Sequence, residues 1–246
     1  MAGIAMKSCR SRQESAVREL FRGDEYDCTA GPPGSLRGVV MRYGESHRRR
    51  THRRIVESAS YGLRQKGAKG LSVIDLMKLA GLTHGGFYNH FESREALVGE
   101  AIAFAMDQTT ERWKKLTDDT ANGERFETLI ADYLSPRHRD NPKHGCALPT
   151  LAVDIARSGS SEQQAFADKL EKMIDVFVEL LPDQPPRQAR QIATGAIATL
   201  VGSIVLSRAV GAGKLSDGIL AAGRMTAGGR TQKPRRRATR TMRCDK

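Results

Sequence analysis

The chain has 246 residues, of which 39% are hydrophobic and 28% are charged, and it carries a net charge of +12. This length suits a small domain plus a larger one, with enough apolar residues for a real core. No run of about 18 apolar residues is present, and charges interrupt the first 21 positions, so we expect neither a transmembrane helix nor a signal peptide, and a cytoplasmic protein. Four cysteines without a C-x-x-C pair predict reduced thiols.

The positive charge is concentrated in two short blocks. Residues 46–97 hold ten Lys/Arg and four Asp/Glu, a net charge of +6, and residues 230–246 reach +7, whereas residues 105–214 carry −1. A basic patch beside a neutral body indicates a polyanion partner for the patch and a separate role for the body. Charge alone leaves open whether the polyanion is DNA, RNA or a membrane surface.

Both ends of the chain have the composition of unstructured segments. Residues 1–45 mix charges with a Gly-Pro-Pro-Gly run and show no sustained period, so we expect a disordered extension with at most a short helix at 15–21. Residues 226–246 are basic and nearly devoid of large apolar side chains, and we expect a disordered tail there. Such charge runs are more often solvated ends than binding elements.

The segment between these ends has helical patterning, which predicts an all-α fold with two domains, at 46–92 and 93–225. In the first domain Ile55, Ala59 and Leu63 recur every four residues, as on the buried face of a helix that Gly67 and Gly70 end.

Two short helices are expected next. Ser72 is a suitable N-cap for one of them and Gly81 ends it; Thr83 caps the other, which is expected to run to Phe91. A short helix, a corner at a glycine in the left-handed conformation, and a second helix opening on small or polar residues make up a helix-turn-helix. Ser93 is expected to cap the long helix that begins the second domain.

The second domain is expected to continue with helices at about 124–134, 147–157, 161–181 and 187–210, with a Pro-, His- and Arg-rich loop at 135–145. The segment 187–210 is apolar on nearly every side, so it should be buried on nearly every side. A lone helical domain seldom achieves this, and we therefore expect a homodimer. The candidate interface residues are Phe166, Leu170, Ile192, Ala196, Leu200 and Ile204.

One run gives a specific resemblance. Residues 83–97 (THGGFYNHFESREAL) resemble the recognition helix and following helix of the tetracycline-repressor family, whose pattern is roughly S/T-x-G-x-L/F-Y-x-H-F-x-S/N-K-E-x-L. Residues 71–82 and 53–59 are similar to the two preceding helices, so the resemblance covers about 46–104. Arg94 stands where the family usually has Lys, which keeps the charge. The resemblance implies a repressor that binds double-stranded operator DNA and is released by a small molecule bound in the helical body.

The residue types in this region suit DNA contact. Hydroxyls at positive helix ends, a glycine that permits close approach, rings with polar tips and basic side chains are suited to phosphates, whereas histidine and asparagine can contact base edges. The candidate DNA-binding residues are Ser72, Thr83, His84, Gly85, Tyr88, Asn89, His90, Arg94, Arg49 and Arg50. His90 is equally suited to a structural hydrogen bond, and Phe87 and Phe91 are expected to pack in the core.

For the second domain the resemblance implies an effector pocket between helices. Candidate lining residues, each also a good core residue, are Phe104, Trp113, Phe126, Tyr133, Cys146, Leu148, Leu151 and Phe177. Cys146 precedes a predicted helix N-terminus among basic residues, which would lower its thiol pKa, so a thiol-based electrophile or redox sensor is an alternative. His138, His144 and Cys146 do not have a recognised metal-ligand spacing, and no metal or cofactor is expected.

Two further function classes were weighed. An enzyme is not expected, because no nucleophile–base–orienter set, phosphate loop or H-E-x-x-H motif is present. A non-specific architectural DNA-binding protein, which would use the two basic blocks, remains an alternative.

Overall fold

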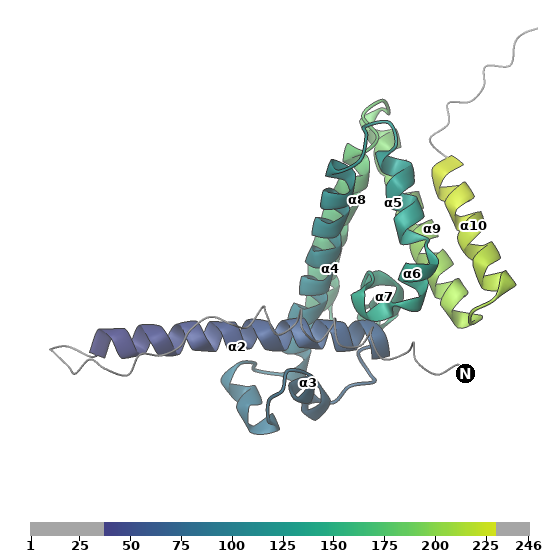
Figure 1. The fold of residues 1–246 in the computed structure, drawn as a ribbon. Helices are drawn as coiled ribbons and strands as arrows, with labels where there is room; N and C mark the ends of the chain where they lie inside the picture. Colours follow the sequence, from purple (N-terminus) through teal and green to yellow (C-terminus); the bar gives the residue numbers. More distant parts are fainter. Residues whose placement is uncertain (1–36, 230–246) are drawn as a thin grey trace, which may run out of the picture. The chain divides into compact units, whose positions relative to one another are not determined.

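The computed structural model describes residues 37–229, which form helices with no strand among them (Figure 1). This confirms the all-α prediction. The small N-terminal domain contains α2 (Arg37–Lys66), α3 (Val73–Leu79) and the 3-10 helix η1 (His84–Asn89). The larger body contains α4 (Arg94–Asp118), α5 (Arg125–Tyr133), α6 (Pro136–Asp140), η2 (Pro142–His144), α7 (Leu148–Ile155), α8 (Ser160–Glu179), α9 (Pro186–Ala209) and α10 (Lys214–Gly228).

The expected boundaries of the terminal segments need correction. Helix α2 begins at Arg37, so residues 37–45 are helical rather than part of a disordered extension. Helix α10, which the sequence pattern did not single out, continues to Gly228 and so includes residues 226–228 of the expected tail. The short helix expected at 15–21 and the basic run at 230–246 lie outside the described residues.

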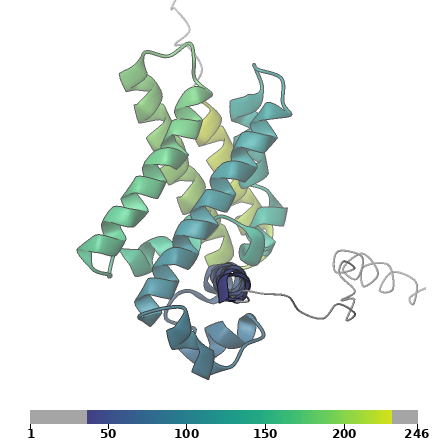
Figure 2. The same ribbon diagram turned by 90° about the vertical axis from the view of Figure 1, so that its left-hand side faces the viewer.

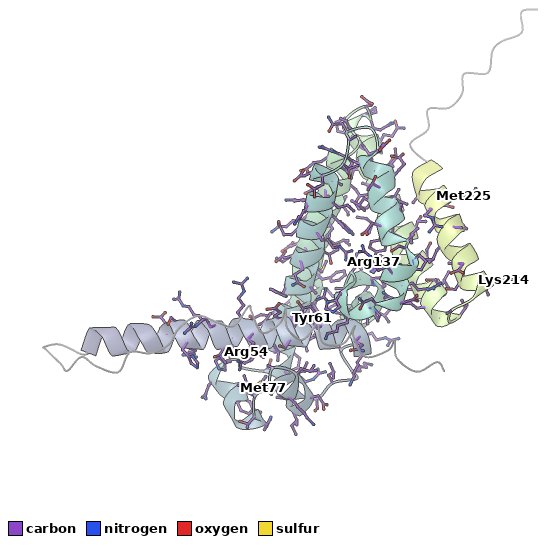
Figure 3. All side chains as sticks on the ribbon, viewed as in Figure 1. Arg54, Tyr61, Met77, Arg137, Lys214 and Met225 are labelled. Carbon is purple, nitrogen blue, oxygen red and sulfur yellow. The ribbon has the colours of Figure 1, made fainter. Side chains whose placement is uncertain are left out.

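The small domain is held together by a compact apolar core beneath α2. Ile55 and Leu63 on α2, Leu76 and Met77 on α3, and Phe87 on η1 are at most 1% exposed. Figure 3 shows Met77 below α2 among these side chains, and Figure 2 shows α3 and η1 lying on one side of α2. The spacing of these apolar residues therefore fixes α3 and η1 against α2.

The corner between α3 and η1 has the predicted geometry. Gly81 has φ of +69°, a left-handed conformation that costs glycine little. Ser72 caps α3 in a capping box with Asp75: the Ser72 hydroxyl accepts a hydrogen bond from the Asp75 amide, and the Asp75 carboxylate accepts one from the Ser72 amide. The helix-turn-helix is thus present, although its second helix is a 3-10 turn. Two consecutive glycines, each about 1 kcal/mol less favourable than alanine in an α-helix, account for this difference.

The body is a layered helical bundle in which α8 packs against α4 and α9, and α9 packs against α10 (Figure 1). Its interior is aromatic: the Trp113 ring lies 5.2 Å from that of Phe177 and 5.8 Å from that of Tyr133. Phe126 on α5 also contacts Phe177, at 5.8 Å. Rings from α4, α5 and α8 therefore make one core.

The predicted dimer residues on α9 are buried within one protomer. Ala196, Leu200 and Ile204 are 0% exposed and Ile192 is 8% exposed, because this face of α9 packs on neighbouring helices of its own chain. Phe166 and Leu170 on α8 are partly buried against the same core. Helix α9 is not buried all round, as we expected, because Val205, Leu206 and Val210 are exposed. It is also the helix, among the described residues, that is long and apolar enough to cross a membrane, a test that core helices of soluble proteins pass as well.

The segment 135–145, expected to be a loop, forms α6 and η2 and is tied to the body. Arg139, only 8% exposed, donates hydrogen bonds to Ser216 and Asp217 at the start of α10, at 2.9 Å and 2.6 Å. His138 is 5% exposed; its Nδ1 lies 2.7 Å from the Tyr133 carbonyl, and its Nε2 accepts a hydrogen bond from the Cys146 amide at 3.0 Å. Burial holds the pKa of His138 down to about 4, so the ring is neutral.

We predict that Gly223→Ala destabilises the chain by about 1–3 kcal/mol, although alanine is the better helix former. Gly223 is buried on α10, and a Cβ there would meet the Ser203 hydroxyl of α9 and lie 2.9 Å from Leu134 Cδ1. The matched control is Gly218→Ala on the same helix, which has open space around it and should stabilise by about 0.5–1 kcal/mol. Urea unfolding measures both, and equal effects of the two substitutions would contradict the close packing of α9 and α10.

Candidate nucleic-acid interface

The outward face of η1 presents polar side chains that the rest of the chain leaves available. Thr83, His84, Gly85 and Asn89 are exposed, and Tyr88 is 72% exposed. The Thr83 hydroxyl makes no capping hydrogen bond. A large aromatic side chain held in solvent is unusual for a monomeric domain and marks a contact surface. The structure brings these five predicted residues together on one short element.

The inward face of η1 fixes this surface in place. Phe87 and Phe91 are 1% and 4% exposed, with ring centroids 5.7 Å apart, as expected for core residues. Arg48 of α2 donates a hydrogen bond to the Asn89 carbonyl at 2.8 Å. Sequence reasoning did not find this contact, because a bond between residues 41 positions apart leaves no local pattern.

His90 has a mainly structural environment. Its ring is 6.2 Å from that of His52 and 6.3 Å from that of Phe91, and its Nδ1 is buried with no hydrogen-bond partner among the described residues. Burial, followed by the charges of His52, Arg48 and His47, lowers the pKa of His90. A neutral, half-buried imidazole is a weak phosphate ligand, so this residue belongs to the support of η1 rather than to its exposed face.

Arg94 is a clamp within the protein. Its guanidinium donates hydrogen bonds to the Leu71 carbonyl, at 2.9 Å and 3.2 Å, and to the Ala68 carbonyl. These acceptors lie in the loop between α2 and α3, and they offset the unfavourable position of Arg94 in the first turn of α4. We expected this placement to favour a phosphate contact; the structure shows instead that the loop satisfies the guanidinium.

Ser72 is also engaged within its own helix. Its hydroxyl donates to the Asp75 carboxylate at 2.6 Å, and this hydrogen bond lowers the pKa of Asp75. A carboxylate at this helix start disfavours a phosphate there, so Ser72 serves as the N-cap.

The basic stretch of α2 supplies charge beside η1. Arg49 is paired with Glu45 at 2.5 Å. Arg50, Arg53 and Arg54 are exposed, and within the described part of the chain they form no ion pair or hydrogen bond. Together with the exposed face of η1 they make a surface that offers hydrogen-bond donors and positive charge, the combination that a nucleic-acid backbone requires.

The candidate effector residues of the body are mostly core residues. Trp113, Phe126, Tyr133, Leu148, Leu151 and Phe177 are at most 4% exposed, and Phe104 is partly buried. Two polar atoms in this core, Trp113 Nε1 and the Tyr133 hydroxyl, have no hydrogen-bond partner among the described residues. Buried polar atoms without partners are uncommon in folded proteins and indicate that the core near Trp113 and Tyr133 is incomplete without another group.

Cys146 differs from the expectation of a low thiol pKa. The residue is 0% exposed, and burial raises the pKa of its thiol despite neighbouring groups that lower it. A buried, protonated thiol is a poor nucleophile, because the thiolate is the reactive form. The structure therefore gives no support to the thiol-sensor alternative.

We predict that iodoacetamide alkylates Cys146 at least about ten times more slowly in the native chain than in the urea-unfolded chain. Peptide mass spectrometry follows this cysteine separately from the three others. Equal rates at pH 7.5 would show that the thiol is accessible and would revive the sensor alternative.

Comparison with known proteins identifies the helix-turn-helix. Residues 55–101 match the family model of bacterial regulatory proteins of the tetR family. An uncharacterized HTH-type transcriptional regulator of Mycobacterium tuberculosis, Rv0196, is 25% identical over 166 residues, which cover 63% of this chain and 82% of the relative. The HTH-type transcriptional repressor KstR2 of the same species is 31% identical over 77 residues, 31% of this chain and 38% of the relative.

Solved structures share the fold over most of the chain. A TetR-family regulator from Cytophaga hutchinsonii has a TM-score of 0.61 at 21% identity, covering 73% of this chain and 94% of that protein. The reduced form of Escherichia coli NemR has a TM-score of 0.62 at 16% identity, covering 73% and 95%. At these identities the likeness establishes the arrangement of helices in the body as well as in the small domain.

Proposed function

Because the chain belongs to the tetR family of bacterial regulatory proteins and is a DNA-binding transcriptional regulator, we propose that it is a homodimeric repressor released from a palindromic operator by a small-molecule effector. It acts in the cytoplasm, where its operator is. The observation that carries the proposal is the exposed face of η1, with Thr83, His84, Tyr88 and Asn89 turned to solvent beside the basic stretch of α2. Repression is favoured because the similar KstR2 is a repressor.

In the proposed complex η1 enters the major groove. His84 and Asn89 contact base edges, and Thr83 and Tyr88 contact the sugar-phosphate edge. The arginines of α2 add a sequence-independent attraction to phosphates, which weakens as salt rises. The contacts of Ser72, His90 and Arg94 within the protein assign them to supporting this surface.

The homodimer is proposed to form through the outer face of the α9–α10 hairpin. Of the large hydrophobic side chains that are exposed, five lie on or beside these two helices: Val205, Leu206, Val210, Leu215 and Met225. Two copies of an apolar two-helix face make a four-helix interface with two-fold symmetry. Such symmetry requires operator half-sites separated by about one helical turn of DNA or a multiple of it.

Footprinting on the DNA upstream of the gene that encodes the chain tests the proposal. We expect one protected palindrome, and gel-shift competition at about 150 mM salt should favour it over random DNA by a factor of about 1,000. Protection without sequence preference would instead identify an architectural DNA-binding protein and would reject the repressor.

A further inference from the structure

A polar pocket lies where α2 meets the body. It has a volume of about 250 Å³ and is lined by Tyr61 and Arg64 of α2, by Gln108, Thr109 and Arg112 of α4, and by His144 of η2. Figure 3 shows Tyr61 on α2 at the point where this helix passes the body. None of these residues was among the candidate effector residues predicted from the sequence.

Arg64 contributes a buried charge without a carboxylate partner. The residue is 3% exposed, and its guanidinium donates to the Gly145 carbonyl at 3.0 Å, to the Gln108 side-chain oxygen at 3.0 Å, and to Ser60. All of these acceptors are neutral. Burial lowers the pKa of Arg64, and the charge of Arg112 lowers it further. A buried guanidinium that lacks a counter-charge is costly, so this site is incomplete electrostatically.

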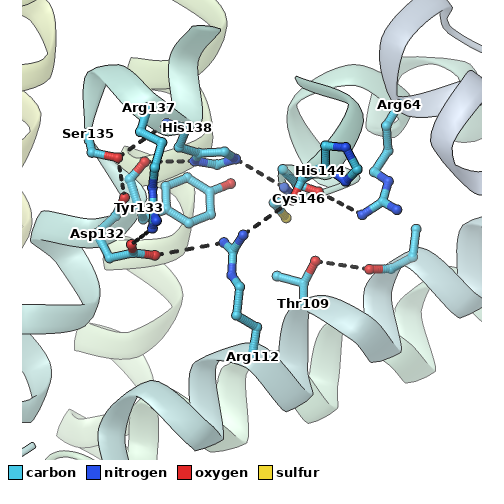
Figure 4. Close-up of polar contacts among 12 residues, drawn as sticks. Arg64, Thr109, Arg112, Asp132, Tyr133, Ser135, Arg137, His138, His144 and Cys146 are labelled. Atoms are coloured by element: carbon cyan, nitrogen blue, oxygen red, sulfur yellow. Dashed lines mark hydrogen bonds and ion pairs between the residues drawn. The ribbon is translucent and has the colours of Figure 1, made fainter. Parts of the chain in front are cut away.

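Arg112 contributes donors that have no acceptor. One of its terminal nitrogens donates to the His144 carbonyl at 3.3 Å, but Nε and Nη2 are buried without a hydrogen bond among the described residues. The nearest carboxylate oxygen, on Asp132, is 3.9 Å from Nη2, and Asp132 is itself bound to Arg137 at 2.6 Å (Figure 4). Arginine nitrogens only donate, so the missing partner must be an acceptor.

The remaining walls favour a small organic anion over a bare ion. The Tyr61 ring lies 5.0 Å from the Arg64 guanidinium carbon, 5.7 Å from the Lys143 ammonium and 5.3 Å from the His144 ring. This aromatic wall suits an apolar or planar part of a ligand whose charged end faces the arginines. The volume is below the roughly 300–1,000 Å³ of pockets for drug-sized ligands, which limits the ligand to a small molecule.

We propose that this pocket binds a small organic anion, whose carboxylate or phosphate group lies between Arg64 and Arg112, and that this anion is the effector. Arginine pairs with either group in bidentate geometry. The regulatory part of the proposal rests on the proposed function, whereas the binding site itself does not.

The position of the pocket gives the anion a route to the DNA-reading surface. The guanidinium of Arg64 holds Gly145, and its carbonyl accepts a hydrogen bond from Thr150 of α7 at 3.0 Å, so α2 is tied to the body through this residue. An anion that takes over Arg64 donors from Gln108 and Gly145 changes this attachment. It thereby favours one position of α2, and of the η1 packed on it, over another.

Isothermal titration calorimetry on the full chain tests the site with benzoate, succinate and inorganic phosphate as probes, and with benzamide as the neutral counterpart of benzoate. We expect at least one of the anions to bind once per chain and benzamide not to bind; the anion that binds shows whether the site takes a carboxylate or a phosphate. Failure of all three anions to bind at 10 mM, a concentration about 100 times a dissociation constant of about 0.1 mM, would overturn the proposal.

Substitutions at the pocket decide whether the arginines hold the anion. Arg112→Gln should weaken binding at least about tenfold, and Arg112→Lys, which keeps the charge, should give an intermediate loss and remains informative if the glutamine variant fails to fold. Lys115→Gln removes the same charge from an exposed position on the same helix and should change the affinity less than about twofold. Equal affinity of the parent chain, Arg112→Gln and Arg112→Lys for the anion would overturn the site.

Gel shifts separate this site from the proposed function. A saturating concentration of the bound anion should lower operator affinity at least about fivefold, the lower end of typical coupling between two sites. An operator affinity that does not change would overturn the effector role. A chain that binds the anion but prefers no DNA sequence would reject the proposed repressor and keep the anion site.

Discussion

Replacing His84 and Tyr88 together by alanine should lower operator affinity about 100-fold while leaving the folded state intact. Both side chains are exposed on η1 and make no hydrogen bond within the described part of the chain, so the fold does not depend on them. Each specific contact to DNA is worth about 1–3 kcal/mol, and every 1.4 kcal/mol corresponds to a tenfold change in affinity.

Gel-shift titration on the footprinted operator measures this loss, with Met225→Ala as the control because Met225 is 78% exposed on α10 and remote from η1 in the sequence. Urea unfolding should give the same free energy of unfolding for the double variant and the parent chain within about 0.5 kcal/mol. An unchanged operator affinity would contradict the assignment of η1 as the reading element. Arg94→Ala is unsuited to this test, since loss of its bonds to Leu71 and Ala68 disturbs the loop before α3.

Lowering the pH from 7 to 4.5 should cost the chain about 2–3 kcal/mol of stability through His138 alone. Its folded-state pKa of about 4 lies below the ordinary value of 6.5, so the unfolded chain takes up the proton more readily. The stabilisation is therefore complete above pH 6.5 and is lost progressively as the pH falls toward 4, by about 1.4 kcal/mol for each pH unit.

Urea unfolding of the parent chain and His138→Gln at both pH values measures the difference. The variant, which lacks the titrating ring, should lose about 2 kcal/mol less than the parent chain between pH 7 and 4.5. His84→Gln, at an exposed histidine, should keep the parental pH dependence. A parental pH dependence in His138→Gln as well would show that other groups cause the acid sensitivity.

The sequence predicted those features that depend on neighbouring residues. Ser72 and Ser93 cap helices as expected, and Gly81 has the left-handed conformation that the corner requires. Helical spacing placed Phe87 and Phe91 in the core and left Tyr88 outside it. Each of these outcomes follows from periodicity or capping within a few residues, which local physical rules describe well.

The features that the sequence did not predict depend on contacts between distant parts of the chain. The bonds of Arg94 join it to carbonyls 23 and 26 positions away, and Arg64 reaches Gly145 across 81 positions. Cys146 is covered from all sides only after the body has folded, and this reversed the expected direction of its pKa shift. The buried face of α9 was predicted correctly as apolar, but its partners are helices of the same protomer.

The separation between the clamp and the reading surface matters for how new binding preferences arise. Arg48 and Arg94 hold the backbone around η1 through carbonyl oxygens, which every amino acid possesses, whereas the outward side chains at positions 83, 84, 88 and 89 carry no part of that scaffold. Exchange of these outward residues is therefore free of a folding penalty. Descendants of this chain, natural or designed, can drift from one promoter to another by mutating a single short turn.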